Sequence, residues 1–213
     1  GPCTSPVTVS GFEMGGNKWL QVRTTDAAGN VSPSRLISIT RRVSVAKPAI
    51  SSAPTGLVAS TLATVKFASS TVGATYGCKL DGNTVPCSGT SWAGTVGQGD
   101  HTFSVVANLS GANSESASTS WSVDSIAPAA PVLTGVPNGT TASKGASVSI
   151  SAEAGASLSC SLDSGDWTSC SSPNVLSNLS DGAHSIAVRA TDAAGNVSKS
   201  ATGAWTVDTT APD

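Results

Sequence analysis

The chain has 213 residues, of which 38% are hydrophobic, 11% are charged and 4% are aromatic, with 22 Gly and 11 Pro. This composition is poor in the Leu, Glu, Lys and Arg that favour helices and is typical of β-proteins. The formal net charge is −2, with no basic cluster beyond Arg41 and Arg42, which argues against nucleic-acid binding. No apolar run approaches the roughly 20 residues that span a bilayer, so we expect no membrane insertion within this chain.

An internal repeat organises the sequence. The run Thr-Asp-Ala-Ala-Gly-Asn-Val-Ser at residues 25–32 recurs letter for letter at residues 191–198, an offset of 166 residues or two steps of 83. The cysteines, the two histidines and two of the tryptophans recur at nearly the same step. Such a repeat indicates domains in a row. We therefore predict the C-terminal half of a repeat at 1–46 and complete repeats at 47–127 and 128–213.

Within the repeats, short runs alternate between apolar and polar residues. In chain order, clear examples cover residues 20–24, 103–107, 147–151 and 184–190. Every second side chain of a strand points to the same face, so these residues should line a core. About seven strands fit into each repeat at the spacing of an antiparallel sandwich, and no helical apolar period persists. The sequence predicts an all-β chain.

Four of the five cysteines bracket predicted hairpin turns. Cys78 and Cys87 flank the run Leu-Asp-Gly-Asn, and Cys160 and Cys170 flank Leu-Asp-Ser-Gly-Asp. Hairpin closure places the two Cβ atoms of each pair at disulfide distance, so we predict both bridges. The alternative is a zinc site shared by the four thiolates, but eight or nine intervening residues are wrong for a zinc knuckle. Two disulfides indicate an oxidising compartment, hence secretion or surface display.

Cys3 occupies the repeat position of Cys87 and Cys170. Its natural partner would lie on a strand upstream of this sequence, so we expect Cys3 to be unpaired. The alternative is an intermolecular disulfide or strand pairing, that is, self-association through the N-terminal half-repeat.

Five separated motifs, in the same order, resemble bacterial Ig-like repeats. They lie at residues 160–163, 170–173, 181–184, 188–196 and 207–212. The resemblance implies tandem immunoglobulin-like β-sandwiches, led by an incomplete N-terminal repeat, of the kind found in large secreted or cell-surface adhesins. Two segments depart from the family pattern, residues 108–113 and residues 40–48.

The sequence offers no convergent set of catalytic groups. His101 and His184 occupy the same place in two repeats, and Lys18 occupies it in the first. Identical isolated sites one repeat apart cannot form one triad. We therefore predict a structural role for both histidines and no enzymatic activity.

Calcium is the cofactor that the family resemblance suggests, since adhesin repeats of this kind can hold Ca²⁺ near domain junctions. The candidate ligands are Asp192 with Asn196, and Asp208; Asp26 with Asn30 is the earlier copy. The alternative is that these Asp and Asn side chains build turns by bonding to the backbone. We favour the turn, because calcium loops carry more acidic ligands than this.

Three tryptophans lack aromatic counterparts in the other copies. Trp121 and Trp205 are repeat equivalents that should be buried. Trp19 is expected to point outward, because the alternation that buries Leu20 turns its neighbour away. Together with Trp92 and Trp167, it is a candidate ligand contact; partial burial at a domain edge is the alternative.

These observations favour a non-catalytic stalk or spacer in a secreted or surface-displayed bacterial adhesin-like protein. The alternative is a ligand-binding module that captures a host protein or a glycan through exposed tryptophans and loops. Fold alone does not choose between the two functions.

Overall fold

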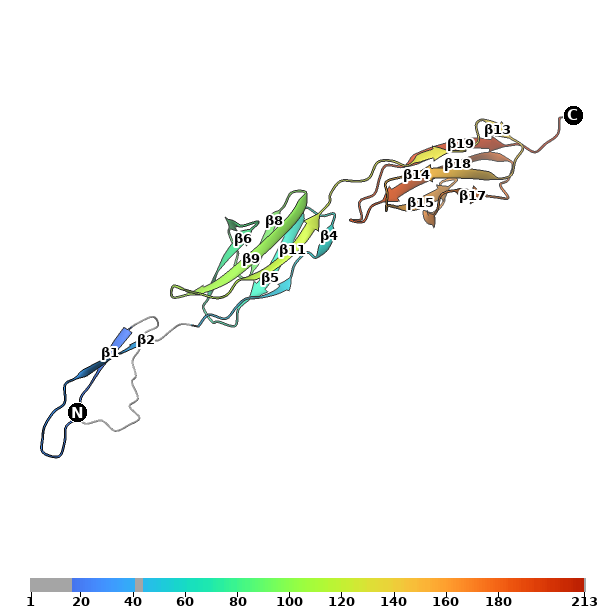
Figure 1. The fold of residues 1–213 in the computed structure, drawn as a ribbon. Helices are drawn as coiled ribbons and strands as arrows, with labels where there is room; N and C mark the ends of the chain where they lie inside the picture. The colour runs from blue at the N-terminus through green and yellow to red at the C-terminus, as the bar shows by residue number, and fades with distance from the viewer. Residues whose placement is uncertain (1–16, 41–43, 213) are drawn as a thin grey trace. The chain divides into compact units, whose positions relative to one another are not determined.

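The computed structural model describes residues 17–40 and 44–212. These residues form strands and turns and no helix, and the strands fall into three groups along the chain (Figure 1). We call them the N-terminal hairpin, the middle sandwich and the C-terminal sandwich, and describe each by itself. The prediction of an all-β chain of immunoglobulin-like sandwiches is confirmed. The predicted domain limits stay a prediction.

The N-terminal hairpin consists of β1 (Asn17–Val22) and β2 (Arg35–Thr40). The two strands pair antiparallel, with Leu20 opposite Ile37 and Trp19 opposite Ser38. Residues that face each other across such a pair lie on one side of the sheet. Leu20 and Val22 are half-buried, whereas Trp19 and Leu36 are exposed.

The middle sandwich contains two sheets, ordered β3-β5-β8 and β4-β11-β9-β6-β7, with β10 paired to β9. Its strands are β3 (Ala49–Ser52), β4 (Gly56–Val58), β5 (Leu62–Ala68), β6 (Thr75–Leu80), β7 (Asn83–Val85), β8 (Ser91–Thr95), β9 (Gly99–Leu109), β10 (Ala112–Asn113) and β11 (Ala117–Val123). Strand β5 alternates strictly between buried and exposed residues. Phe67 of β5 lies against Phe103 of β9, with ring centroids 5.9 Å apart, so the two sheets meet through these rings.

The C-terminal sandwich repeats this plan, with sheets ordered β12-β14-β17 and β13-β19-β18-β15-β16. Its strands are β12 (Val132–Thr134), β13 (Thr140–Thr141), β14 (Ala146–Ser151), β15 (Ser157–Leu162), β16 (Thr168–Cys170), β17 (Asn174–Leu176), β18 (Gly182–Thr191) and β19 (Ala201–Val207). The core combines Val148 and Ile150 from one sheet with Ile186, Val188 and Trp205 from the other. Period-two alternation in β14 and β18 supplies the four aliphatic side chains, as the sequence predicts, and Trp205 comes from β19.

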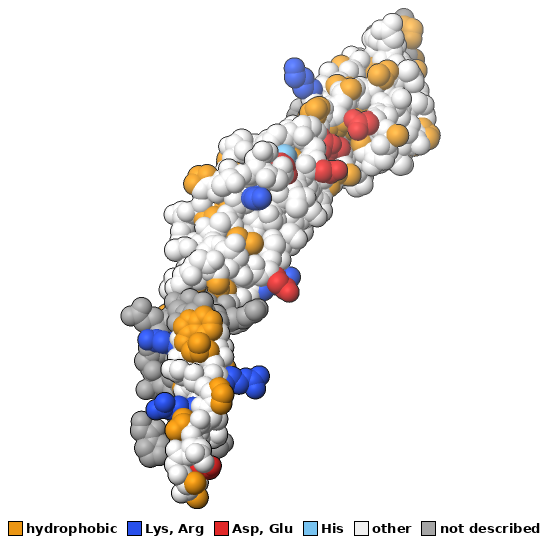
Figure 2. Space-filling model, turned by 60° about the vertical axis from the view of Figure 1, so that its left-hand side comes forward, with side chains coloured by type: hydrophobic (Ala, Val, Ile, Leu, Met, Phe, Trp, Pro, Cys, Tyr) orange, Lys and Arg blue, Asp and Glu red, His pale blue; other side chains and the backbone are white. Residues whose placement is uncertain are grey.

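Repeat-equivalent positions fill equivalent core sites. Val105 and Val188 are both at most 1% exposed, and Trp121 and Trp205 are each 4% exposed, which confirms the prediction that both tryptophans are core residues. Outward positions carry mainly Ser, Thr, Gly and Asn, and most of the surface in Figure 2 is accordingly neither hydrophobic nor charged. The described residues contain no helix that is long and apolar enough to cross a membrane.

Candidate functional site

Each sandwich carries one disulfide-closed hairpin. Cys78 and Cys87 are bonded with Cα atoms 6.0 Å apart, and Cys160 and Cys170 with Cα atoms 5.8 Å apart. These are the pairs that the hairpin spacing predicts, on β6–β7 and β15–β16. Cys3 lies outside the described residues.

An aspartate at each hairpin turn fastens the turn to the neighbouring strand. Asp81 and Asp163 have φ values of 50° and 51°, in the left-handed region that Asp tolerates better than most residues. The backbone N–H of Thr102 donates to Asp81 Oδ1 at 2.7 Å, and that of Ser185 donates to Asp163 Oδ1 at 2.7 Å. Sequence reasoning missed this role, although the Leu-Asp step at both turns was its signal.

The two histidines lie beside these turns and against the core tryptophans. His184 is 8% exposed, and its ring centroid lies 6.0 Å from that of Trp205; His101 lies 5.8 Å from Trp121. His184 Nε2 faces the main-chain oxygen of Ser180 at 2.8 Å, and His101 Nε2 faces that of Gly97 at 3.0 Å. The nitrogen that would activate a nucleophile therefore faces a carbonyl group, which suits a structural role better than catalysis.

The calcium candidates Asp192 and Asn196 form a hydrogen-bonded turn. Asp192 Oδ1 accepts the backbone N–H of Asn196 at 2.8 Å, and Asp192 Oδ2 accepts the Asn196 side-chain amide at 2.9 Å. That amide hydrogen bond, opposed by burial and helped by backbone N–H groups, holds the pKa of Asp192 below its ordinary value. Asp26 and Asn30 make the same two bonds, at 2.8 and 2.9 Å. Both carboxylates are thus already engaged by N–H donors.

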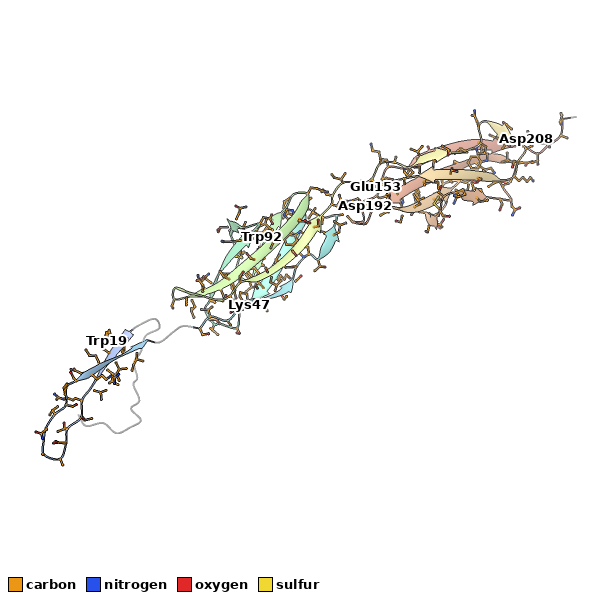
Figure 3. All side chains as sticks on the ribbon, in the orientation of Figure 1. Trp19, Lys47, Trp92, Glu153, Asp192 and Asp208 are labelled. Carbon is orange, nitrogen blue, oxygen red and sulfur yellow. A yellow bond between two sulfur atoms is a disulfide. The ribbon has the colours of Figure 1, made fainter. Side chains whose placement is uncertain are left out.

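Asp208 forms a separate turn, in which Oδ1 accepts the backbone N–H of Thr210 at 3.0 Å and also the Thr210 hydroxyl. The Thr210 hydroxyl is the main cause of the lowered pKa of Asp208. Asp192 and Asp208 lie at opposite ends of the C-terminal sandwich (Figure 3), so one ion cannot bind both. Within residues 17–40 and 44–212, no group of three or more His, Cys, Asp or Glu side chains is placed to hold a metal. The donor set fits turns rather than Ca²⁺, and calcium binding stays a prediction.

The three candidate ligand-contact tryptophans have different environments. Trp92 is only 6% exposed and packs on Phe103 with ring centroids 5.3 Å apart. Its candidacy as a ligand contact was therefore wrong, because the β8 alternation turns the ring into the core. Trp19 is 67% exposed on the hairpin, as its position in the alternation predicts. Because Trp92 is buried, it cannot share an exposed aromatic surface with Trp19.

Trp167 is 37% exposed and lies in the turn of the C-terminal disulfide hairpin. The Arg189 guanidinium carbon lies 4.2 Å from the Trp167 ring centroid, in the geometry of a cation–π contact. In the part of the chain that the structure describes, no carboxylate forms an ion pair with Arg189. The stack holds the indole against the outer face of the sheet.

Comparison with protein families gives the C-terminal sandwich a name. Residues 129–209 match the family model described as bacterial Ig-like domain. This segment is a bacterial Ig-like domain. The matched segment contains the disulfide hairpin, His184 and Trp167. The family that the motifs at residues 160–212 resemble is thereby confirmed for this segment.

The chain is also similar to several solved structures. The fibronectin(III)-like modules of Clostridium thermocellum CbhA are 18% identical, with a TM-score of 0.49, over 76% of this chain and 94% of that chain. The FN1–FN3 domains of chicken CNTN1 are 15% identical, with a TM-score of 0.41, over 88% and 76%. A structure concerning host cell surface retention of a 1.5-MDa bacterial ice-binding adhesin is 17% identical, with a TM-score of 0.40, over 88% and 74%. A search of curated proteins found no match.

Proposed function

We propose that the chain is a run of non-catalytic spacer repeats in a secreted or surface-displayed bacterial protein, in the manner of an adhesin stalk. The observation that carries this proposal is the duplication of the framework. Core residues, disulfide hairpin, turn aspartate and histidine all recur between the two sandwiches. A spacer needs every one of its domains to be stable, so the residues that stabilise one domain recur in the next. An active site instead needs one convergent set of catalytic groups.

The disulfides support a location outside the cytoplasm. A hairpin bridge persists only where thiols are not kept reduced. Domains of about 80 residues bury only a modest core. A disulfide adds to their stability, which is most useful where no chaperone is available. The neutral Ser- and Thr-rich surface is consistent with a solvent-exposed spacer.

The test is an exchange in the bacterial host. One strain carries two unrelated sandwich domains of equal length in place of residues 47–213, and a second strain lacks these residues. For a spacer, the exchange should preserve surface display and cell attachment, and the deletion should reduce attachment. Loss of attachment after the exchange, with display intact, would show that these repeats themselves bind a ligand.

A second candidate function, glycan binding, is favoured by the Trp167–Arg189 stack. A partly exposed indole held in one orientation offers a flat apolar face for a sugar ring, and it loses little side-chain entropy on binding. Arg189, without a carboxylate partner among the described residues, can donate hydrogen bonds to an acidic group of the ligand. The ligand class is therefore an acidic glycan rather than a neutral one.

The middle sandwich offers a matched control for this candidate. Thr84 and Val106 occupy the repeat positions of Trp167 and Arg189, on a groove of the outer sheet face. If the stack binds glycans, Trp167→Ala should abolish the binding of a hyaluronan oligosaccharide in calorimetry, and Thr84→Trp with Val106→Arg should add a second site. No measurable binding by the unaltered chain would reject glycan binding and leave the spacer proposal untouched.

A further inference from the structure

Both ring nitrogens of His184 face oxygen acceptors. Nδ1 lies 2.8 Å from Asp163 Oδ2, and Nε2 lies 2.8 Å from the main-chain oxygen of Ser180. A neutral imidazole carries one N–H and can donate to only one of these partners, whereas the imidazolium donates to both. We infer that His184 is held as an imidazolium at neutral pH and forms, with Asp163, a charged latch that closes the C-terminal sandwich.

The latch joins three segments of the Ig-like domain. Asp163 belongs to the turn between β15 and β16, which the Cys160–Cys170 bridge closes. Its other oxygen, Oδ1, accepts the backbone N–H of Ser185 on β18. Ser180 belongs to the loop before β18, so the His184 ring bonds this loop to the turn. One protonated ring therefore holds the loop and the turn together at the edge of the core.

In the described part of the chain, three charged groups lie near His184, and of these only Asp163 contacts its ring. Asp181 lies next to the loop, and Lys144 precedes β14 across from it. Lys144 Nζ and Asp181 Oδ1 lie 3.9 Å apart and form an exposed ion pair. Asp181 also accepts the Thr209 hydroxyl at 2.9 Å. Asp163 is the carboxylate whose oxygen contacts the ring.

The pKa directions of the pair agree with the geometry. The Ser180 carbonyl and then Asp163 raise the pKa of His184 above 6.5, against the opposing effect of burial. Burial tends to raise the pKa of Asp163, but the Ser185 N–H and His184 together bring it below 3.8. A raised histidine pKa means stability that is complete below about pH 6.5 and is lost as pH rises through the folded pKa. A lowered aspartate pKa means stability that is lost as pH falls through its own folded pKa.

The same position carries a cation or a titratable ring in every copy of the repeat. His101 takes this place in the middle sandwich, where its Nε2 likewise faces a main-chain oxygen, that of Gly97. Asp81 likewise bonds the backbone N–H of Thr102 at the start of the pairing strand. In the N-terminal hairpin the residue is Lys18, whose side chain carries a positive charge. The repeated choice supports a requirement for positive charge at this site.

The decisive experiment is an NMR titration of the His184 ring in the full chain carrying His101→Gln, which leaves one histidine. The latch predicts a titration midpoint above pH 7, because only then is the ring mostly protonated at neutral pH. Asp163→Asn retains an oxygen for the Ser185 N–H but removes the charge, and it should lower the midpoint. A midpoint at or below pH 7 in the chain with Asp163 intact would overturn the inference, as would a midpoint that Asp163→Asn leaves unchanged.

Thermal melts give a second readout. The melting temperature of the C-terminal domain should fall as pH is raised from 6 to 9, and His184→Gln should flatten that dependence. Equal pH dependence in both proteins would contradict the latch.

Discussion

The N-terminal hairpin and the C-terminal Ig-like domain contain the same eight-residue loop in different surroundings. In both, the Asp and Asn of the loop make the same hydrogen bonds at the same distances. The strands beside the loops differ: Ile186 and Val188 are at most 1% exposed, whereas their equivalents Leu20 and Val22 are only half-buried. The loop therefore forms its hydrogen bonds from its own residues alone, whereas burial of the neighbouring strands depends on a second sheet.

The second sheet of the Ig-like domain is β12-β14-β17. Its side chains Val148 and Ile150 complete the core against β18 and β19. Among the described residues, β1 and β2 pair with each other and with no further strand. Trp19, Leu36 and Ile37 stay exposed there. The comparison predicts that identical changes in the two regions will have unequal effects.

The largest inequality is expected for the matched pair Ile186 and Leu20. Ile186→Ala should destabilise the C-terminal domain by about 2–5 kcal/mol, because a fully buried side chain leaves a cavity. Leu20→Ala should leave that unfolding transition unchanged. Urea denaturation followed by tryptophan fluorescence measures both, and equal losses would contradict the account.

Removal of the disulfide should have the next largest effect. In the loop-entropy model, closing the short loop between Cys160 and Cys170 contributes about 3 kcal/mol. Replacing both cysteines by alanine should lower the denaturation midpoint of the C-terminal domain accordingly. The matched change at Cys78 and Cys87 should act on the middle sandwich by a similar amount. A loss confined to one of the two sandwiches would argue against equivalent roles.

A smaller loss of stability is expected from a substitution at Gly203, which occupies the repeat position of Ile37 in the hairpin. A Cβ atom at Gly203 would lie 2.7 Å from Val136 Cγ1, so Gly203→Ala should cost about 1–3 kcal/mol through overpacking. Val136→Ala in the same protein should recover part of the loss. No recovery would mean that the cost arises elsewhere than at Val136. The hairpin accommodates Ile37 at the equivalent position as an exposed residue.

The loops themselves should respond alike in the two regions. Asp26→Ala and Asp192→Ala each remove the acceptor of two Asn hydrogen bonds, so backbone amide exchange at Asn30 and Asn196 should accelerate in both. The lowered pKa of both aspartates places the loss of these bonds, on acidification, below the ordinary pKa of 3.8. Added Ca²⁺ should leave exchange unchanged. Protection by Ca²⁺ at Asn196 would instead support the calcium interpretation.

The sequence predicted much of this molecule for identifiable reasons. Period-two alternation located β14 and β18, and the exact repeat located equivalent core residues such as Trp121 and Trp205. Cysteine spacing predicted both disulfides, because each joins two cysteines that are close in the sequence and flank one hairpin turn. Each of these signals lies within one element or between two copies.

Features that depend on contacts between distant segments could not be predicted from the sequence. Trp92 was a surface candidate because no other copy has an aromatic residue there, yet it fills the core beside Phe103. The pairing of Asp163 with His184 joins a hairpin turn to strand β18 across 21 positions of the chain. The requirement for glycine at 203 arises from Val136, which belongs to another part of the same domain. No periodicity or spacing encodes such contacts.

The central claim is that these sandwiches are closed by their own disulfides and work outside the cytoplasm. Mass-spectrometric mapping of cysteines in the protein taken from its bacterial host, after cell fractionation, tests it directly. The account predicts Cys78–Cys87 and Cys160–Cys170 bridges in the surface or extracellular fraction. Free thiols at these four positions, in protein recovered from the cytoplasm, would contradict it.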